Sequence, residues 1–126
     1  MDSQTERRES LRLRPKLDTF VALRPEFSTL GKLLDINRSG LCFLYLTKEA
    51  PVDTPEAISI DMFDDTDGYY LPNIPCRMVY DEKSKTDMTY ITGLEYRRCG
   101  LRFDRLSPEQ KEHLERYLKE HTDKGE

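Results

Sequence analysis

The sequence predicts a small, mainly β domain, built as a barrel or a sandwich, that ends in one α-helix. Short segments in which apolar and polar residues alternate recur from residue 18 to residue 103, with turn residues between them. From Ser107 onward the apolar spacing becomes helical. A chain of 126 residues suits one hydrophobic core, so we predict a single folded domain over residues 17–126.

Seven segments have the composition and alternation of strands. A proline-rich stretch, 49–55, and a charged stretch, 81–87, separate some of them. The predicted strands are 18–23, 29–34, 41–46, 58–62, 74–80, 88–96 and 101–103.

The predicted helix spans about residues 107–122. Ser107 and Gln110 form the spacing of a capping box, and Pro108 occupies the first helical position. The apolar stripe that we expect to pack on the β region is Leu114, Tyr117, Leu118 and His121.

The composition predicts a soluble, cytoplasmic protein. Hydrophobic residues make up 37 % of the chain and charged residues 35 %, and no run of eighteen apolar residues exists to insert into a membrane. The first residues lack the apolar segment of a signal peptide. Cys42, Cys76 and Cys99 are odd in number and widely spaced, which predicts reduced core thiols.

No motif predicts an enzyme, a metal site or a cofactor, so we expect no catalytic residues. The phosphate-binding loop, the glycine-rich dinucleotide motif and the nucleophile elbow do not occur. The segment 64–68 lacks ligands at the ends of a calcium loop. His113 and His121 are eight residues apart on the predicted helix, without a glutamate–histidine metal pattern.

A basic arm precedes the β region. Residues 7–16 hold five basic residues and one acidic residue, a net charge of +4, whereas the whole chain carries −4. We predict that residues 1–16 form a flexible arm. A solvated tail is the usual explanation of such a run, and the acidic body argues against nucleic acid as the general partner.

A polar corner separates the second and third predicted strands. Asp35, Asn37 and Ser39 can each bond to nearby backbone, and Gly40 can adopt a positive φ. The simpler interpretation is a hairpin turn with locally satisfied side chains. The functional one has Asp35 and Asn37 project from one side of the strand end.

The arm and the corner together suit a guanine nucleotide. An arginine fork can bond to a phosphate or to O6 and N7 of guanine. A carboxylate such as Asp35 can accept from N1–H and the exocyclic amine of guanine. One ligand that carries both phosphates and guanines would bind to both the arm and the corner.

The same residues resemble the motifs of PilZ domains. The arm segment from Arg8 to Arg12 fits the motif RxxxR, and Asp35–Gly40 fits DxSxxG, with Asn37 in the place of serine. The segment Cys99–Phe103, followed by the capped helix, looks like the closing strand and helix of that family. The resemblance covers nearly the whole chain.

The resemblance implies a six- or seven-stranded antiparallel barrel that binds cyclic di-GMP, a bacterial second messenger. Arg8 and Arg12 would hold phosphate and guanine edges, with Arg7 at the periphery. Asp35 would hold a guanine edge, Asn37 would replace the serine, and Gly40 would permit the turn. The ligand-binding set is thus Arg7, Arg8, Arg12, Asp35, Asn37 and Gly40.

The mechanism that we predict is ordering of the arm. Residues 1–14 would be mobile without ligand, fold across the barrel when cyclic di-GMP binds, and signal to a downstream protein. The alternative is a degenerate PilZ domain that contacts a protein independently of the nucleotide, which the departure at Asn37 supports. A small barrel that binds single-stranded nucleic acid is the third hypothesis.

Overall fold

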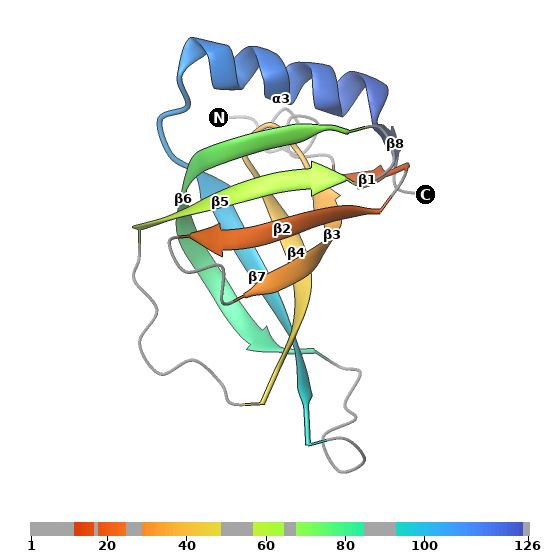
Figure 1. Ribbon diagram of the computed structural model, residues 1–126, viewed down its shortest axis with the longest axis vertical. Coiled ribbons are helices and arrows are strands. Elements are labelled where there is room, and N and C mark those ends of the chain that lie inside the picture. The colour runs from red at the N-terminus through yellow and green to blue at the C-terminus, as the bar shows by residue number, and fades with distance from the viewer. Residues whose placement is uncertain are drawn as a thin grey trace, which may run out of the picture.

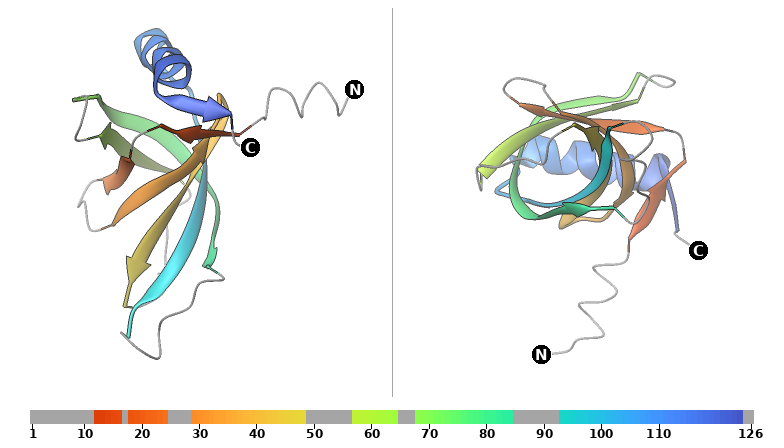
Figure 2. Two further views of the ribbon diagram at one scale, coloured as in Figure 1. Left: turned by 90° about the vertical axis from the view of Figure 1, so that its right-hand side faces the viewer. Right: turned by 90° about the horizontal axis from the view of Figure 1, so that it is seen from below.

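Six antiparallel strands close into a barrel in the computed structural model, which describes residues 12–16, 18–24, 29–48, 57–64, 68–84 and 93–124. The strand order is β2-β5-β6-β7-β4-β3, and pairing of β2 with β3 closes the ring, as Figure 2 shows from below. The barrel strands are β2 (Thr19–Arg24), β3 (Leu30–Ile36), β4 (Gly40–Thr47), β5 (Ala57–Asp64), β6 (Tyr70–Lys83) and β7 (Glu95–Phe103). The predicted barrel is confirmed.

Two short outer strands, β1 (Leu13–Pro15) and β8 (Thr122–Lys124), extend the sheet beyond β3. β1 pairs with β8 over three residues and with β3 where Leu13 faces Ile36. The sequence analysis placed residues 13–15 in the arm, because three residues are too few to show alternation. They form a strand since β8 offers their backbone groups hydrogen-bonding partners.

The rest of the predicted arm lies outside the described residues, apart from Arg12 and Lys16, so its flexibility stays a prediction. At the base of the arm, the Lys16 N–H donates to the His121 carbonyl at 2.8 Å. The chain leading to the barrel is therefore attached to the end of the C-terminal helix.

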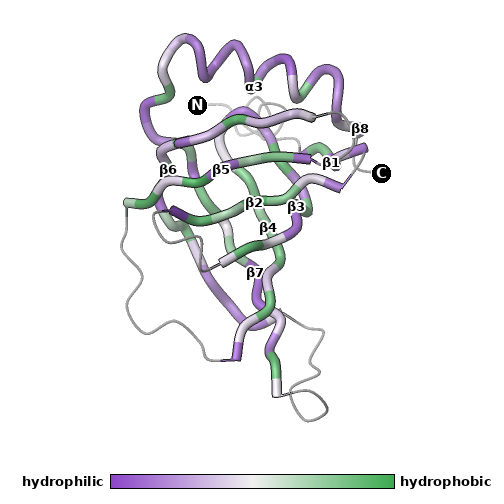
Figure 3. The backbone as a smooth tube through the Cα atoms, viewed as in Figure 1, coloured by the Kyte–Doolittle hydropathy of each residue, from purple (hydrophilic) through white to green (hydrophobic). Residues whose placement is uncertain are grey.

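The barrel interior contains the side chains that alternation predicted, and Figure 3 shows this alternation along the strands. Val21, Phe43 and Ile60 are fully buried there. Cys76 and Cys99 belong to the same core, where burial raises the pKa of each thiol to about 12. These two cysteines therefore behave as neutral, apolar groups, as predicted.

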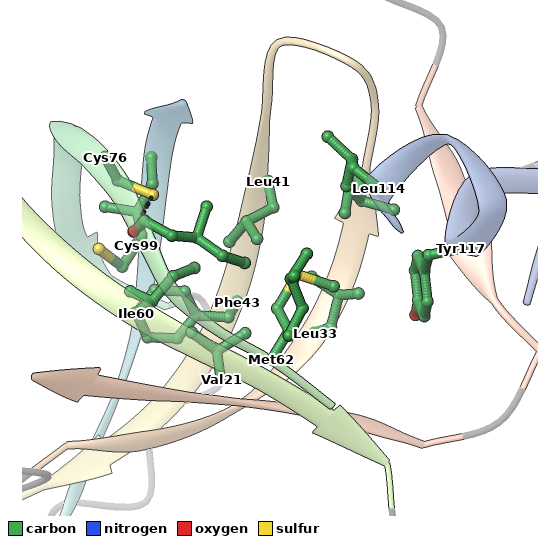
Figure 4. Close-up of a cluster of buried hydrophobic side chains, with 14 of the residues drawn as sticks. Val21, Leu33, Leu41, Phe43, Ile60, Met62, Cys76, Cys99, Leu114 and Tyr117 are labelled. Carbon is green, nitrogen blue, oxygen red and sulfur yellow. Dashed lines mark hydrogen bonds between the residues drawn. The ribbon is translucent and has the colours of Figure 1, made fainter. Parts of the chain in front are cut away.

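The helix α3 (Pro108–Glu120) lies across one end of the barrel (Figure 1). The predicted capping box is present: Ser107 Oγ accepts from the Gln110 N–H at 3.1 Å, and Gln110 Oε1 accepts from the Ser107 N–H at 3.0 Å. Leu114 and Tyr117 reach from the helix toward the core side chains (Figure 4). Within the described ranges, no helix is long and apolar enough to cross a membrane.

The last barrel strand differs from its prediction. The segments 88–96 and 101–103 were predicted as two strands, but β7 runs without interruption from Glu95 to Phe103. The predicted break includes Gly100, a residue type that weakens a strand pattern. In the structure this glycine pairs with Cys42 of β4 and with Tyr80 of β6. Residues 88–92 lie outside the described part of the chain.

Candidate functional site

One row of residues crosses four strands on the outward-facing side of the barrel wall. Asp35 of β3 faces Cys42 of β4, Cys42 faces Gly100 of β7, and Gly100 faces Tyr80 of β6. Cys42 lies between Leu41 and Phe43, which both point into the core, so its own side chain points outward. The row therefore starts at the predicted corner and continues around the barrel.

Arg12 and Asp35 meet at the beginning of this row. Arg12 Nη1 donates to Asp35 Oδ1 at 2.5 Å, although the two residues are 23 positions apart in the sequence. Partial burial lowers the pKa of Arg12, but the hydrogen bond and charge of Asp35 outweigh this and raise it above its ordinary value. The arm and the corner, which the sequence analysis connected through a shared ligand, are thus in direct contact.

Asn37 caps the loop between β3 and β4. Its Oδ1 accepts from the N–H groups of Ser39, at 2.8 Å, and Gly40, at 3.0 Å. The Asn37 N–H in turn donates to the Gly40 carbonyl at 2.9 Å. This is the local satisfaction that the simpler interpretation expected. A contact between Asn37 and a ligand stays a prediction.

Gly40 is required by close packing rather than by its backbone angle. Among the described residues, the glycines with positive φ are Gly68 and Gly93, so Gly40 does not use the positive φ that its residue type allows. A Cβ atom at Gly40 would lie 2.0 Å from the Leu101 carbonyl oxygen. The loop approaches β7 so closely that only glycine fits.

Three side chains extend the site beyond Asp35. The Tyr80 ring covers Gly100, where a Cβ atom would lie 2.3 Å from the ring, and the Tyr80 hydroxyl donates to Cys42 Sγ at 3.2 Å. Arg98 of β7 also reaches the Cys42 sulfur, through Nη2 at 3.9 Å. Burial and the bond to Cys42 raise the pKa of Tyr80 to about 12, so the phenol stays neutral. We call Arg12, Asp35, Cys42, Tyr80 and Arg98 the corner cluster.

The structure brings together only part of the predicted set. Arg12, Asp35 and the loop from Asn37 to Gly40 are adjacent, whereas Arg7 and Arg8 lie outside the described residues. Tyr80 and Arg98 were missed, because neither residue belongs to one of the sequence motifs. Gly100 was the available signal, because a glycine inside a strand often marks the close approach of another group.

The corner cluster carries two guanidinium groups and one carboxylate, so it is suited to an anionic partner. Asp35 also supplies a hydrogen-bond acceptor. No set of three or more His, Cys, Asp or Glu side chains suitable for a metal ion occurs among the residues that the structure describes. The arrangement can bind a ligand with phosphates and amide-like donors.

Comparisons with known proteins agree with this architecture. The family model of the PilZ domain matches residues 6–120. Among solved structures, the PilZ domain with c-di-GMP of YcgR from Escherichia coli is similar, with a TM-score of 0.63 and 17 % sequence identity over 86 % of each chain. None of the curated protein sequences compared with this chain matched it. Because the family model covers most of its length, the chain belongs to the PilZ domain family.

Proposed function

We propose that this PilZ domain is a receptor for cyclic di-GMP that uses the corner cluster and the basic arm. The observation that supports this most strongly is the meeting of Arg12 and Asp35, which come from two sequence motifs 23 positions apart. A structural relative, the PilZ domain of YcgR, was solved with c-di-GMP. The same ligand has the two kinds of group that an arginine and a carboxylate recognise.

Each end of the cluster has a distinct role in this proposal. Arg12 bonds to a phosphate or to a guanine edge with its planar fork, together with Arg7 and Arg8 of the arm. Asp35 accepts from N1–H and the exocyclic amine of one guanine. Gly40 keeps the loop against β7, where a larger residue would not fit. Asn37 holds the loop closed and contacts the ligand from the edge of that loop.

The ion pair between Arg12 and Asp35 does not prevent these two side chains from binding the ligand. The Arg12 side chain is 53 % exposed and the Asp35 side chain 18 % exposed. A solvent-exposed ion pair of this kind contributes at most about 1 kcal/mol to the stability of the fold. Within the described part of the chain, Arg12 is the donor that bonds to Asp35, so the second carboxylate oxygen is available to a guanine.

The base of the arm provides a route for the signal. β1 pairs with β8, and the backbone bond from Lys16 to His121 joins the arm to the end of α3. Ordering of the arm on ligand binding would therefore act on α3 and β8, which present the response to a downstream protein. The described cysteines are free thiols, in keeping with the cytoplasmic location that we propose.

A calorimetric titration with cyclic di-GMP tests the proposal. The parent protein should bind saturably, and Asp35→Ala should weaken binding by about 2 kcal/mol, roughly 30-fold, because a charged acceptor is lost. Glu112→Ala is the matched control, since Glu112 pairs with Arg116 on the helix. Absence of binding by the parent at high micromolar ligand would reject the function.

One observation favours the second candidate, a degenerate PilZ domain that binds a protein without the nucleotide. The Asn37 carboxamide oxygen is already used by two backbone N–H groups of the loop. If this departure from serine abolishes binding, a protein partner should associate equally well with and without cyclic di-GMP. Pull-down in the presence and absence of the nucleotide distinguishes the two candidates.

A further inference from the structure

Arg98 has a conformation that satisfies its guanidinium poorly. Its Nε atom is buried, and no hydrogen-bond acceptor in the described part of the chain contacts it. Among the described residues, the acceptor that its Nη2 atom reaches is the Cys42 sulfur, at 3.9 Å, and a thiol is a weak acceptor. A buried donor without an acceptor raises the free energy of the folded protein. Movement of the Arg98 side chain to a better acceptor would therefore lower this free energy.

The charge of Arg98 also has no paired carboxylate among the residues that the structure describes. Within the described part of the chain, no ion pair involves Arg98, although Glu82 is its register partner on β6. The neighbouring arginine provides a contrast, because Arg97 Nε bonds to Asp81 Oδ1 at 2.8 Å and Arg97 also pairs with Glu95. Arg97 is therefore structural, and Arg98 is available.

The position of Arg98 places it at the proposed ligand site. Its guanidinium contacts Cys42, and Cys42 is the register partner of Asp35. The contact with Cys42 raises the pKa of Arg98, and so does the charge of Asp35, although partial burial lowers it. Arg12 bonds to Asp35 and Arg98 contacts Cys42, so both guanidinium groups border the Asp35–Cys42 pair.

We propose that Arg98 is a further ligand-binding residue, which leaves the Cys42 sulfur and donates a forked pair of hydrogen bonds to the bound dinucleotide. This inference rests on the proposed function. A fork of two N–H groups matches either the O6 and N7 acceptors of the second guanine or two phosphate oxygens. Asp35 would hold one guanine of the ligand, and Arg98 would hold the part that extends across β4 to β7.

The test is calorimetric titration of the parent, Arg98→Ala and Arg98→Lys with cyclic di-GMP. Arg98→Ala should raise Kd about 10-fold or more, since a charged, forked contact is lost. Arg98→Lys should recover only part of that loss, because lysine keeps the charge without the fork. The matched control is Arg116→Ala on α3, which should bind as the parent does.

Two readouts separate a binding role from a structural one. The thermal midpoint of the free protein should not fall in Arg98→Ala, because the substitution removes a donor without an acceptor. A cyclic di-GMP analogue with 7-deazaguanine should show a smaller effect of Arg98→Ala if Arg98 bonds to guanine N7. An equal effect with both ligands would assign the contact to phosphate.

The outcomes distinguish this inference from the proposed function. If the parent binds cyclic di-GMP and Arg98→Ala binds it equally well, the role of Arg98 is overturned and the receptor function stands. Equal losses in Arg98→Ala and Arg116→Ala would also overturn it, since only general charge would then matter. No binding by the parent would overturn both.

Discussion

Two carboxylate–arginine pairs on the barrel have the same chemistry and different surroundings. Asp35 pairs with Arg12 at the corner, and Asp61 of β5 pairs with Arg24 of β2. The Asp61 side chain is 4 % exposed, whereas the Asp35 side chain is 18 % exposed. The difference lies in how many donors each carboxylate has.

Asp61 is saturated by the protein. It accepts two bonds from Arg24, at 2.7 and 3.2 Å, one from the Tyr70 hydroxyl at 3.0 Å, and one from the Asn73 N–H at 3.0 Å. These bonds join β2, β5 and β6 at an irregularity in strand pairing, where Asn73 has a φ of 55°. Asp61 therefore stabilises the fold and has no capacity left for a ligand.

Asp35 has one donor in the described part of the chain, and that donor is more than half exposed. The comparison teaches that a carboxylate–arginine pair by itself does not identify a binding site. The number of donors that the carboxylate lacks distinguishes a site that is available to a ligand from a structural contact.

The largest difference between the two pairs should appear in stability. Asp61→Ala should lower the free energy of unfolding by about 2 kcal/mol, since it removes a buried carboxylate that accepts hydrogen bonds from Arg24, Tyr70 and Asn73. Asp35→Ala should change it by less than about 1 kcal/mol, because the pair is exposed. Urea denaturation of both variants measures this, and equal losses would show that the corner is structural as well.

The arm should affect binding and not folding. Arg12→Ala or Arg8→Ala should weaken cyclic di-GMP binding by about 2 kcal/mol, because each removes a charged, forked contact. Titration calorimetry measures the loss, and urea denaturation of the free variants is the control. Unfolding of either free variant would instead assign the arm a structural role.

Asn37 should have a smaller effect. Asn37→Ala should weaken binding by about 1 kcal/mol, since it removes the acceptor that closes the loop through two backbone N–H groups. Asn37→Ser should keep or raise affinity, because a hydroxyl can accept the same bonds. Titration of both variants beside the parent measures this, and equal affinities for Asn37→Ala and Asn37→Ser would show that closing the loop does not contribute to binding.

The smallest predicted effect is a pH dependence at Asp61. Burial raises the pKa of Asp61, but the bonds from Arg24, Asn73 and Tyr70 outweigh it and hold the pKa below its ordinary value. A carboxylate with a lowered folded-state pKa adds stability above its unfolded pKa of about 3.9 and loses it as the pH falls further. The difference in unfolding free energy between the parent and Asp61→Asn should therefore be constant from about pH 7 to 5 and shrink below about pH 4. A difference that shrinks already near neutral pH would contradict this assignment.

The sequence predicted those parts of the molecule that depend on local pattern. Alternation identified the barrel strands, and the spacing of Ser107 and Gln110 identified the start of the helix. Residues 13–15 and 122–124 were missed as strands, because each pairs with a segment at the other end of the chain.

The residues of the candidate site also fall into two groups, those that local patterns predict and those that depend on distant pairing. Arg12, Asp35 and Gly40 belong to contiguous motifs and could be predicted, although the structure requires Gly40 for its close approach to Leu101 and not for a positive φ. Arg98 and Tyr80 belong to no motif. They join Asp35 only through the register of four strands, and single-sequence patterns do not encode register between distant strands.

A titration with cyclic di-GMP followed through backbone amide NMR shifts tests the central claim most directly, because it reports both carboxylate–arginine pairs in one sample. We predict saturable shifts at the amides of Asp35, Gly40, Cys42 and Arg98, while those of Asp61 and Asn73 stay unchanged. Shifts centred on Asp61 and Asn73, or none at high micromolar ligand, would contradict the assignment of the corner cluster as the binding site.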